Sequence, residues 1–180
     1  MAATTRYTLA GQRALVTGGS RSIGRAIALG LARCGARVAI NYHRDAEAAR
    51  TAVAEIESHG GWAMAVQADV ADPGAVEQMM GRVEAALGPV DILVNNAGVL
   101  TRTPFLEIPI DEWDRILRTN LRGFFVVGQA VARRMVQHGI QGCIVNVASS
   151  SSRYASLNLS HYAASKGGAT MLTRSMAYEL

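Results

Sequence analysis

Lysine, cysteine and long apolar segments are all scarce in this sequence of 180 residues. The two cysteines, Cys34 and Cys143, lie in apolar surroundings without the spacing of metal ligands. We therefore expect small buried side chains rather than a disulfide or a nucleophile. The histidines also lack metal-ligand spacing, and they are scattered along the chain: His43, His59, His138 and His161. The sequence predicts no metal site.

Segments that could enter a membrane are missing as well. No apolar run approaches the length of a membrane-spanning helix, and the first 13 residues lack the apolar part of a signal peptide. Apolar residues make up 49% and charged residues 18% of the chain, a balance typical of globular domains. We expect a cytoplasmic protein with no membrane partner.

The net charge of +4 could attract nucleic acid, but the arginines are dispersed. No basic run exceeds the pair Arg133–Arg134 and no aromatic residues interleave with it, so we expect no nucleic-acid partner. Of the 18 basic residues, 17 are arginine, and the only lysine is Lys166. It follows Tyr162 by four residues, so one helix face would hold both side chains. Because a compact ammonium differs from a planar guanidinium, this placement indicates a chemical role.

Short apolar runs alternate with helical patterns along the whole chain. The runs ALVT, VAI, ILVN and CIVNVA are continuous, which is typical of strands buried on both faces. The pattern predicts a single α/β domain over residues 1–180, a Rossmann-type doubly wound parallel sheet of five strands with helices on both faces. A long helix is expected from Asp111 to His138, and a closing helix from about Ser160.

A glycine-rich turn, TGGSRSIG at Thr17–Gly24, joins the first predicted strand to the first helix. In such a turn, glycines let backbone N–H groups approach a pyrophosphate, and the helix N-terminus adds partial positive charge. Gly18 would form the tight turn and Gly24 the close contact between helix and strand. An ordinary turn is the alternative, which the surrounding strand–helix–strand pattern makes weaker.

The turn resembles the cofactor loop of the short-chain dehydrogenase/reductase family. Three more segments match in order: NNAG at Asn95–Gly98, TNLRG at Thr119–Gly123 and YAASK at Tyr162–Lys166. The resemblance covers essentially the whole chain and is greatest to the 3-oxoacyl-carrier-protein reductases. It implies an NAD(P)(H)-dependent oxidoreductase that interconverts a ketone and a secondary alcohol, in a homodimer or homotetramer. A 3-oxoacyl thioester is the substrate that the resemblance favours, while sugars, steroids and small ketones stay open. Family members continue for two more strands, so the resemblance also implies a C-terminally truncated chain.

Four residues match the family's catalytic set: Asn120, Ser149, Tyr162 and Lys166. Tyr162 would donate a proton to the substrate's carbonyl oxygen, although the ordinary pKa of a tyrosine, about 10, is high for this task. Lys166 would lower that pKa by its charge and, by the resemblance, bind the ribose hydroxyls. Ser149, rather than the adjacent Ser150, would bind the substrate oxygen, since it precedes Tyr162 by 13 residues as in the family. Asn120 would hold a water in a proton relay to the lysine.

The cofactor residues implied by the resemblance lie on the glycine turn, at strand ends and on the last helix: Thr17, Gly18, Ser20, Arg21, Ser22, Ile23, Gly24, Tyr42, His43, Arg44, Asp69, Val70, Asn96, Ala97, Gly98, Tyr162 and Lys166. Asp69 and Val70 resemble an adenine contact, with a strand-end turn as an equal alternative. For Asn95, a structural role that holds the sheet together is as good an interpretation as contact with the cofactor.

The segment INYHR, at the end of the second strand, has no acid to bind a ribose 2′-hydroxyl. Arg21 and Arg44 suit a 2′-phosphate, so NADP(H) is preferred and NAD(H) is the alternative. Ser22 stands where the family has a glycine, and we expect a modest loss of cofactor affinity there, since a Cβ crowds the turn and a positive φ is costly.

A second class of function stays open, namely a catalytically silent dinucleotide-binding or interaction module, or an inactive fragment of a longer reductase. The intact set of four catalytic residues favours the enzyme. The expected truncation favours the silent module.

Overall fold

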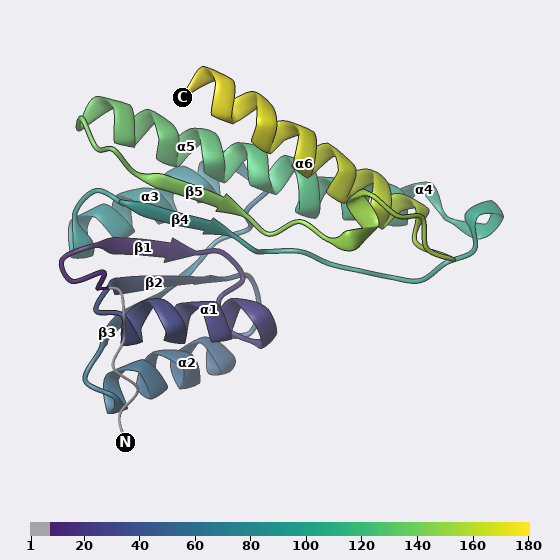
Figure 1. The fold of residues 1–180 in the computed structure, drawn as a ribbon. Coiled ribbons are helices and arrows are strands. Elements are labelled where there is room, and N and C mark those ends of the chain that lie inside the picture. The colour runs from purple at the N-terminus through teal and green to yellow at the C-terminus, as the bar shows by residue number, and fades with distance from the viewer. Residues whose placement is uncertain (1–7) are drawn as a thin grey trace.

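The computed structural model describes residues 8–180; residues 1–7, on which the expectation of no signal peptide partly rests, lie outside it. Five parallel strands form one sheet in the order β3-β2-β1-β4-β5 (Figure 1). The strands are β1 (Arg13–Val16), β2 (Arg37–Tyr42), β3 (Trp62–Gln67), β4 (Ile92–Asn95) and β5 (Cys143–Asn146). The predicted fold class, a doubly wound parallel sheet, is confirmed.

Helices cover both faces of this sheet (Figure 1). One face carries α1 (Ser22–Arg33) and α2 (Ala46–Ser58). The other carries α3 (Pro73–Leu87), α5 (Gly123–Gln137) and α6 (Ser160–Glu179). Helix α3 begins as its sequence predicts, with Pro73 at its first position and the Asp72 carboxylate accepting a hydrogen bond from the amide of Ala75.

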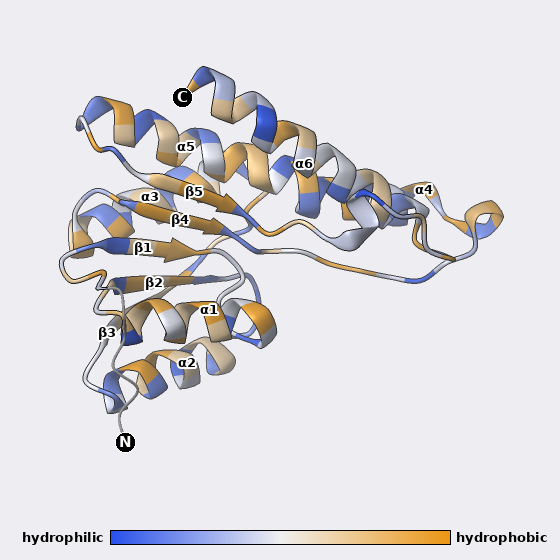
Figure 2. Cartoon of the chain, in the orientation of Figure 1, coloured by the Kyte–Doolittle hydropathy of each residue, from blue (hydrophilic) through white to orange (hydrophobic). Residues whose placement is uncertain are grey.

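Strands β1 to β4 contribute apolar side chains to two cores, one on either side of the sheet, whereas β5 contributes Ile144 to one of them. In β1, Leu15 packs towards α3 and α5, whereas Ala14 and Val16 pack towards α1 and α2. Figure 2 shows largely apolar strands between helices that are apolar on part of their surface. Burial on both faces explains the continuous apolar runs of β1, β2 and β4, but not that of β5, where Cys143 and Val145 are exposed.

The strand order places a crevice at the centre of the sheet. The chain runs outwards from β1 through β2 to β3, then returns to pair β4 with the other side of β1. Ligands of such sheets bind beyond the carboxyl ends of the strands at this reversal. The glycine turn follows β1 at that point.

The helix expected from Asp111 to His138 is interrupted. Helix α4 (Ile110–Leu117) passes into a π-helical turn (Arg118–Arg122), and α5 follows. Asn120, in this turn, uses its side chain to bind the backbone of Val99. A single π turn of this kind often marks a functional site, and apolar periodicity does not reveal it.

The expectation that both cysteines are buried is wrong. Cys143 is exposed and Cys34 is only partly buried. Cys143 belongs to β5, which forms an edge of the described sheet, and Val145 in the same strand is 45% exposed.

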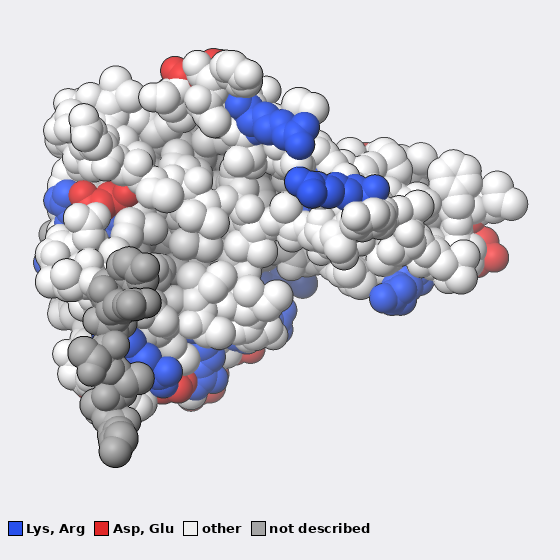
Figure 3. All heavy atoms as spheres, viewed as in Figure 1, with Lys and Arg blue, Asp and Glu red and all other residues white. Residues whose placement is uncertain are grey.

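The described residues contain neither a helix that is long and apolar enough to cross a membrane nor a group of three metal-ligating side chains. On the face that Figure 3 shows, Lys and Arg side chains lie in separate groups rather than in one patch.

Candidate active site

The glycine turn is held against the start of the segment that follows β4. Thr17 is buried, and its hydroxyl oxygen accepts hydrogen bonds from the amides of Asn96 (2.9 Å) and Ala97 (3.1 Å). The Asn96 side chain donates to the carbonyl oxygens of Thr17 (3.0 Å) and Gly18 (3.1 Å). Hydrogen bonds within the protein therefore hold the glycine turn in a defined shape.

Two positions of the turn accept only glycine. Gly18 has a φ of +60°, and a Cβ there would lie 2.9 Å from the Cα of Ala97. A Cβ on Gly24 would lie 2.2 Å from the carbonyl oxygen of Gly18. Ser22 has a φ of +49°, the strained backbone expected where the family has a glycine.

Asn41, which the sequence reasoning missed, ties three segments together. It is buried, its Oδ1 accepts from the amide of Gly18 (3.3 Å), and its Nδ2 donates to the carbonyl oxygen of Ala68 (3.1 Å). The glycine turn is thereby joined to the ends of β2 and β3. An amide side chain inside the apolar run VAIN was the available sign of this role.

A cleft of about 720 Å³ opens at the carboxyl ends of the strands, beside this turn. Every predicted cofactor residue except the buried Thr17 lines it: Gly18, Ser20, Arg21, Ser22, Ile23, Gly24, Tyr42, His43, Arg44, Asp69, Val70, Asn96, Ala97, Gly98, Tyr162 and Lys166. Residues absent from the prediction also line it, among them Asn41, Leu100, Arg115, Arg118 and Val147. The cleft thus joins the glycine turn to Tyr162 and Lys166, which are distant in sequence.

One wall of the cleft carries an ion pair between Arg118 and Asp69, with nitrogen and oxygen 2.8 Å apart. Burial alone would raise the pKa of Asp69, but the amide of Ala71 and the Arg118 guanidinium lower it below its ordinary value. Asp69 is therefore a carboxylate at neutral pH, an acceptor facing the cleft.

Lys166 is only 4% exposed and has no carboxylate partner among residues 8–180. Its Nζ donates to the carbonyl oxygen of Val147 (2.7 Å) and lies 4.7 Å from the centre of the Phe124 ring. Burial without a counter-charge lowers the pKa of Lys166 to about 8. The Tyr162 ring centre lies 6.0 Å from the same nitrogen.

Asn120 is fully buried and does not line the cleft. Its Oδ1 accepts from the amide of Val99 (2.8 Å), and its Nδ2 donates to the carbonyl oxygen of Val99 (2.9 Å) and to Ser165 Oγ (3.1 Å). Both N–H groups of the side chain are therefore used within the protein, and they fix the segment after β4 to α6. Any bond to a relay water would use the remaining lone pair of Oδ1.

Ser149 lies after β5 and follows Ala148 in the chain. Its hydroxyl oxygen accepts from the amide of Ser151 (3.1 Å) and caps a short 3₁₀ turn, η3 (Ser150–Ser152). That bond leaves the hydroxyl proton of Ser149 available as a donor. The neighbouring Ala148 lines the cleft, whereas Ser149 does not.

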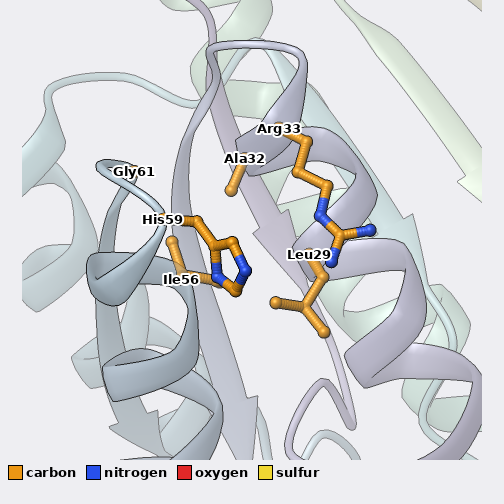
Figure 4. A pocket seen from close by; sticks show the side chains of 6 residues that line it. All are labelled: Leu29, Ala32, Arg33, Ile56, His59 and Gly61. Carbon is orange, nitrogen blue, oxygen red and sulfur yellow. The ribbon is translucent and has the colours of Figure 1, made fainter. Parts of the chain in front are cut away.

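A second, much smaller cavity lies between α1 and α2 (Figure 4). Its volume is about 20 Å³, and its walls are Leu29, Ala32, Arg33, Ile56, His59 and Gly61. This is room for one water molecule and not for a substrate.

Comparisons with known proteins agree with this geometry. The family described as short chain dehydrogenase matches residues 12–180. Gluconate 5-dehydrogenase of Gluconobacter oxydans is 44% identical over 171 residues, which is 95% of this chain and 66% of that protein. The 3-oxoacyl-[acyl-carrier-protein] reductase of Synechocystis is 38% identical over 96% of this chain and 69% of that protein.

Among solved structures, a short chain dehydrogenase from Burkholderia cenocepacia in complex with NADP has a TM-score of 0.88 and 44% identity, over 96% of this chain and 69% of that one. This chain therefore spans about two thirds of the length of the proteins it matches.

Proposed function

Because this chain belongs to the short chain dehydrogenase family, we propose that it is an oxidoreductase that interconverts a ketone and a secondary alcohol with a nicotinamide cofactor. The observation that carries the proposal is the single cleft lined by the glycine turn, Tyr162 and Lys166. A domain over residues 1–180 that acts as a cytoplasmic homodimer or homotetramer is part of the same proposal.

The residues of the cleft fit a dinucleotide. Gly18 and Gly24, where a Cβ would press on the backbone of Ala97 and of Gly18, permit the tight turn that brings the N-terminus of α1 to the cleft, and such a helix N-terminus suits a pyrophosphate. Arg21, His43 and Arg44 line the same cleft beside the end of β2. Asp45 also lines it, but its carboxylate accepts a hydrogen bond from the amide of Ala48 as the cap of α2. We infer a preference for NADP(H) over NAD(H), with Asp69 as the acceptor for the adenine amine. When bound, this cofactor supplies or takes up the hydride.

The protein's own groups handle the proton. In the direction of reduction, Tyr162 donates its phenolic proton to the carbonyl oxygen of the substrate as that oxygen gains charge. The Lys166 ammonium favours the phenolate that remains, and it lies in a buried site where its charge is weakly screened. Ser149 donates its free hydroxyl proton to the same substrate oxygen. Asn120 holds the surrounding backbone in place, and a water on its Oδ1 would connect Lys166 with solvent.

Two substrate classes follow from the relatives. The first is a keto sugar acid, since a relative at 44% identity is a gluconate 5-dehydrogenase. The second is a 3-oxoacyl thioester, the substrate class that the motifs favoured, since a 3-oxoacyl-[acyl-carrier-protein] reductase is 38% identical.

The test is NADPH oxidation by the 180-residue chain with 5-ketogluconate and, separately, an acetoacetyl thioester. We expect Tyr162→Phe to reduce kcat by about 10²- to 10⁴-fold, the range for a lost general acid, while NADPH still binds. Tyr178→Phe is the matched control, because Tyr178 is 94% exposed. Equal turnover by both variants would refute the role of Tyr162. NADPH binding without turnover by the unaltered chain would identify a silent module.

The cofactor preference has its own test. Arg44→Ser should weaken NADPH binding by about 10- to 100-fold and leave NADH binding unchanged, since a charge-assisted bond to the 2′-phosphate is lost. Arg33→Ser, in the last turn of α1, is the control. An equal effect on both cofactors would contradict the assignment.

A further inference from the structure

Three polar side chains from two segments converge on one oxygen atom, Oε1 of Glu112 in α4. Thr101 and Thr103, in the segment after β4, each donate a hydroxyl proton to it at 2.7 Å. His161, at the start of α6, places Nε2 at 2.9 Å from the same oxygen. None of the sequence motifs contains Glu112, Thr101 or Thr103, and the mechanism above does not use them.

The hydrogen bonds define the protonation state of this cluster. The hydroxyl groups of Thr101 and Thr103 lower the pKa of Glu112 to about 2, so it is a carboxylate at neutral pH. His161 is fully buried, and its Nδ1 has no hydrogen-bond partner among the described residues. Because Glu112 Oε1 is an acceptor, the ring nitrogen that faces it, Nε2, carries a proton. That proton is shared between Glu112 Oε1 and Thr101 Oγ1, the latter 3.0 Å away.

The N-terminus of α6 has no side-chain cap. The residue before the helix, Leu159, makes no capping hydrogen bond, so the turn that contains Tyr162 has none of the usual side-chain stabilisation. His161 supplies an anchor in place of a cap, because its bond to Glu112 fastens this turn to α4, which lies beside the start of α6 (Figure 1).

Tyr162 is therefore held from two sides. On one side, Ser165 Oγ donates to the Tyr162 carbonyl oxygen (2.7 Å) and accepts from Asn120. On the other side, its neighbour His161 is bound to Glu112. The threonines bind the same Glu112 oxygen and come from the segment whose earlier part, up to Leu100, lines the cleft.

We propose that Glu112 is a positioning residue for Tyr162: it sets the distance between the proton donor on α6 and the wall of the cleft that follows β4. This inference rests on the proposed function, because it assigns Tyr162 as the proton donor. Glu112 acts through His161 and the two threonines and itself touches no reacting atom.

Two substitutions at one position separate this role from mere packing. Glu112→Gln keeps an oxygen that can accept the three hydrogen bonds, whereas Glu112→Met keeps the length of the side chain and removes the acceptor. We expect Glu112→Met to lower kcat by about 10- to 100-fold, the effect of a small misplacement of a catalytic group, and Glu112→Gln to stay within about fivefold of the unaltered protein. The dissociation constant for NADPH, measured by fluorescence, should change by less than about twofold in both, because the glycine turn is separate from the cluster.

Amide hydrogen exchange provides a readout that does not need turnover. Peptides covering residues 99–103 and 159–166 should exchange faster in Glu112→Met and at the normal rate in Glu112→Gln. Glu107→Met is the matched control, since Glu107 is exposed and forms no ion pair with the described residues. If Glu112→Met fails to fold, Thr103→Val, which removes one of the three donors, should give a smaller change in the same direction.

Normal kcat and normal exchange in Glu112→Met would overturn the inference, as would an equal loss in Glu112→Gln, since the acceptor would then not be what matters. Absence of turnover in the unaltered chain would count against the proposed function. In that case the exchange comparison still decides whether Glu112 holds the first turn of α6.

Discussion

Because Lys166 is the only lysine in the chain, protein labelled with ¹³C at the ε carbon of lysine gives a single side-chain signal in NMR. We predict that this signal, in protein without cofactor, titrates with a midpoint of about 8, well below the ordinary value of 10.5. The same sample unfolded in denaturant provides the reference, where the midpoint should return to about 10.4.

The size of this effect follows from the surroundings of the amine. Lys166 is 4% exposed, and the group that accepts its hydrogen bond is the uncharged carbonyl of Val147. The difference between 10.5 and about 8 corresponds to about 3 kcal/mol against the charged form in the folded protein. Between these two values the unfolded chain binds more protons than the folded one, so the free energy of unfolding should rise as pH increases across that interval.

A substitution makes the sign of the effect on stability measurable. Lys166→Met removes the buried charge, so its free energy of unfolding should exceed that of the unaltered protein at pH 7 by up to about 3 kcal/mol, less about 1 kcal/mol for the lost hydrogen bond. The advantage should shrink as pH rises through the interval. A folded-state midpoint near 10.5, or an advantage of Lys166→Met over the unaltered protein that is no larger at pH 7 than at high pH, would refute the reasoning.

Three further predictions concern the turn and the sheet. Ser22→Gly should raise the free energy of unfolding by about 1 kcal/mol, because Ser22 has a φ of +49°. NADPH should bind at least as tightly, and a lower temperature of thermal unfolding would contradict this prediction. Gly24→Ala should cost about 2 kcal/mol and weaken NADPH binding more than tenfold, whereas Gly30→Ala on the same helix, where a Cβ meets nothing within 4 Å, should be neutral or stabilising. Asp91→Asn should destabilise the protein at neutral pH, since Arg13 donates to both Asp91 oxygens at 2.7 Å and thereby lowers the Asp91 pKa. The difference in stability between Asp91→Asn and the unaltered protein should disappear as the pH falls below 3.8, the ordinary pKa of an aspartate. A difference that persists at lower pH in acid unfolding would contradict the assignment.

The parts of the fold that depend on local pattern could be predicted from the sequence. Continuous apolar runs predicted β1, β2 and β4, where burial on both faces restricts which residues fit, and the glycine spacing predicted the turn after β1. The strain at Ser22 was also predictable, because a positive φ is costly for a residue with a Cβ, and Ser22 has a φ of +49°.

Other features could not be predicted, because they depend on partners that are far away in the chain. The π-helical turn at Asn120 exists through bonds to Val99 and Ser165, and no periodicity encodes such contacts. The same holds for Glu112 and His161, which are 49 residues apart. Cys143 was predicted to be buried from its apolar neighbours, but the position of its strand at the sheet edge leaves it exposed.

The strand order also determines the sequence in which the site is assembled during synthesis. The segment from β1 to β3 pairs locally, Arg13 with Arg37 and Arg37 with Trp62, so this half of the sheet can collapse while later residues are still being made. The turn after β1 gains the donors that fix Thr17 only when β4 arrives. We expect the amine of Lys166 to become buried last, once β5 and α6 have packed against the rest of the domain. We therefore expect the glycine turn to take its shape before Tyr162 and Lys166 are in place, and slow closure of the β1–β4 contact would delay both.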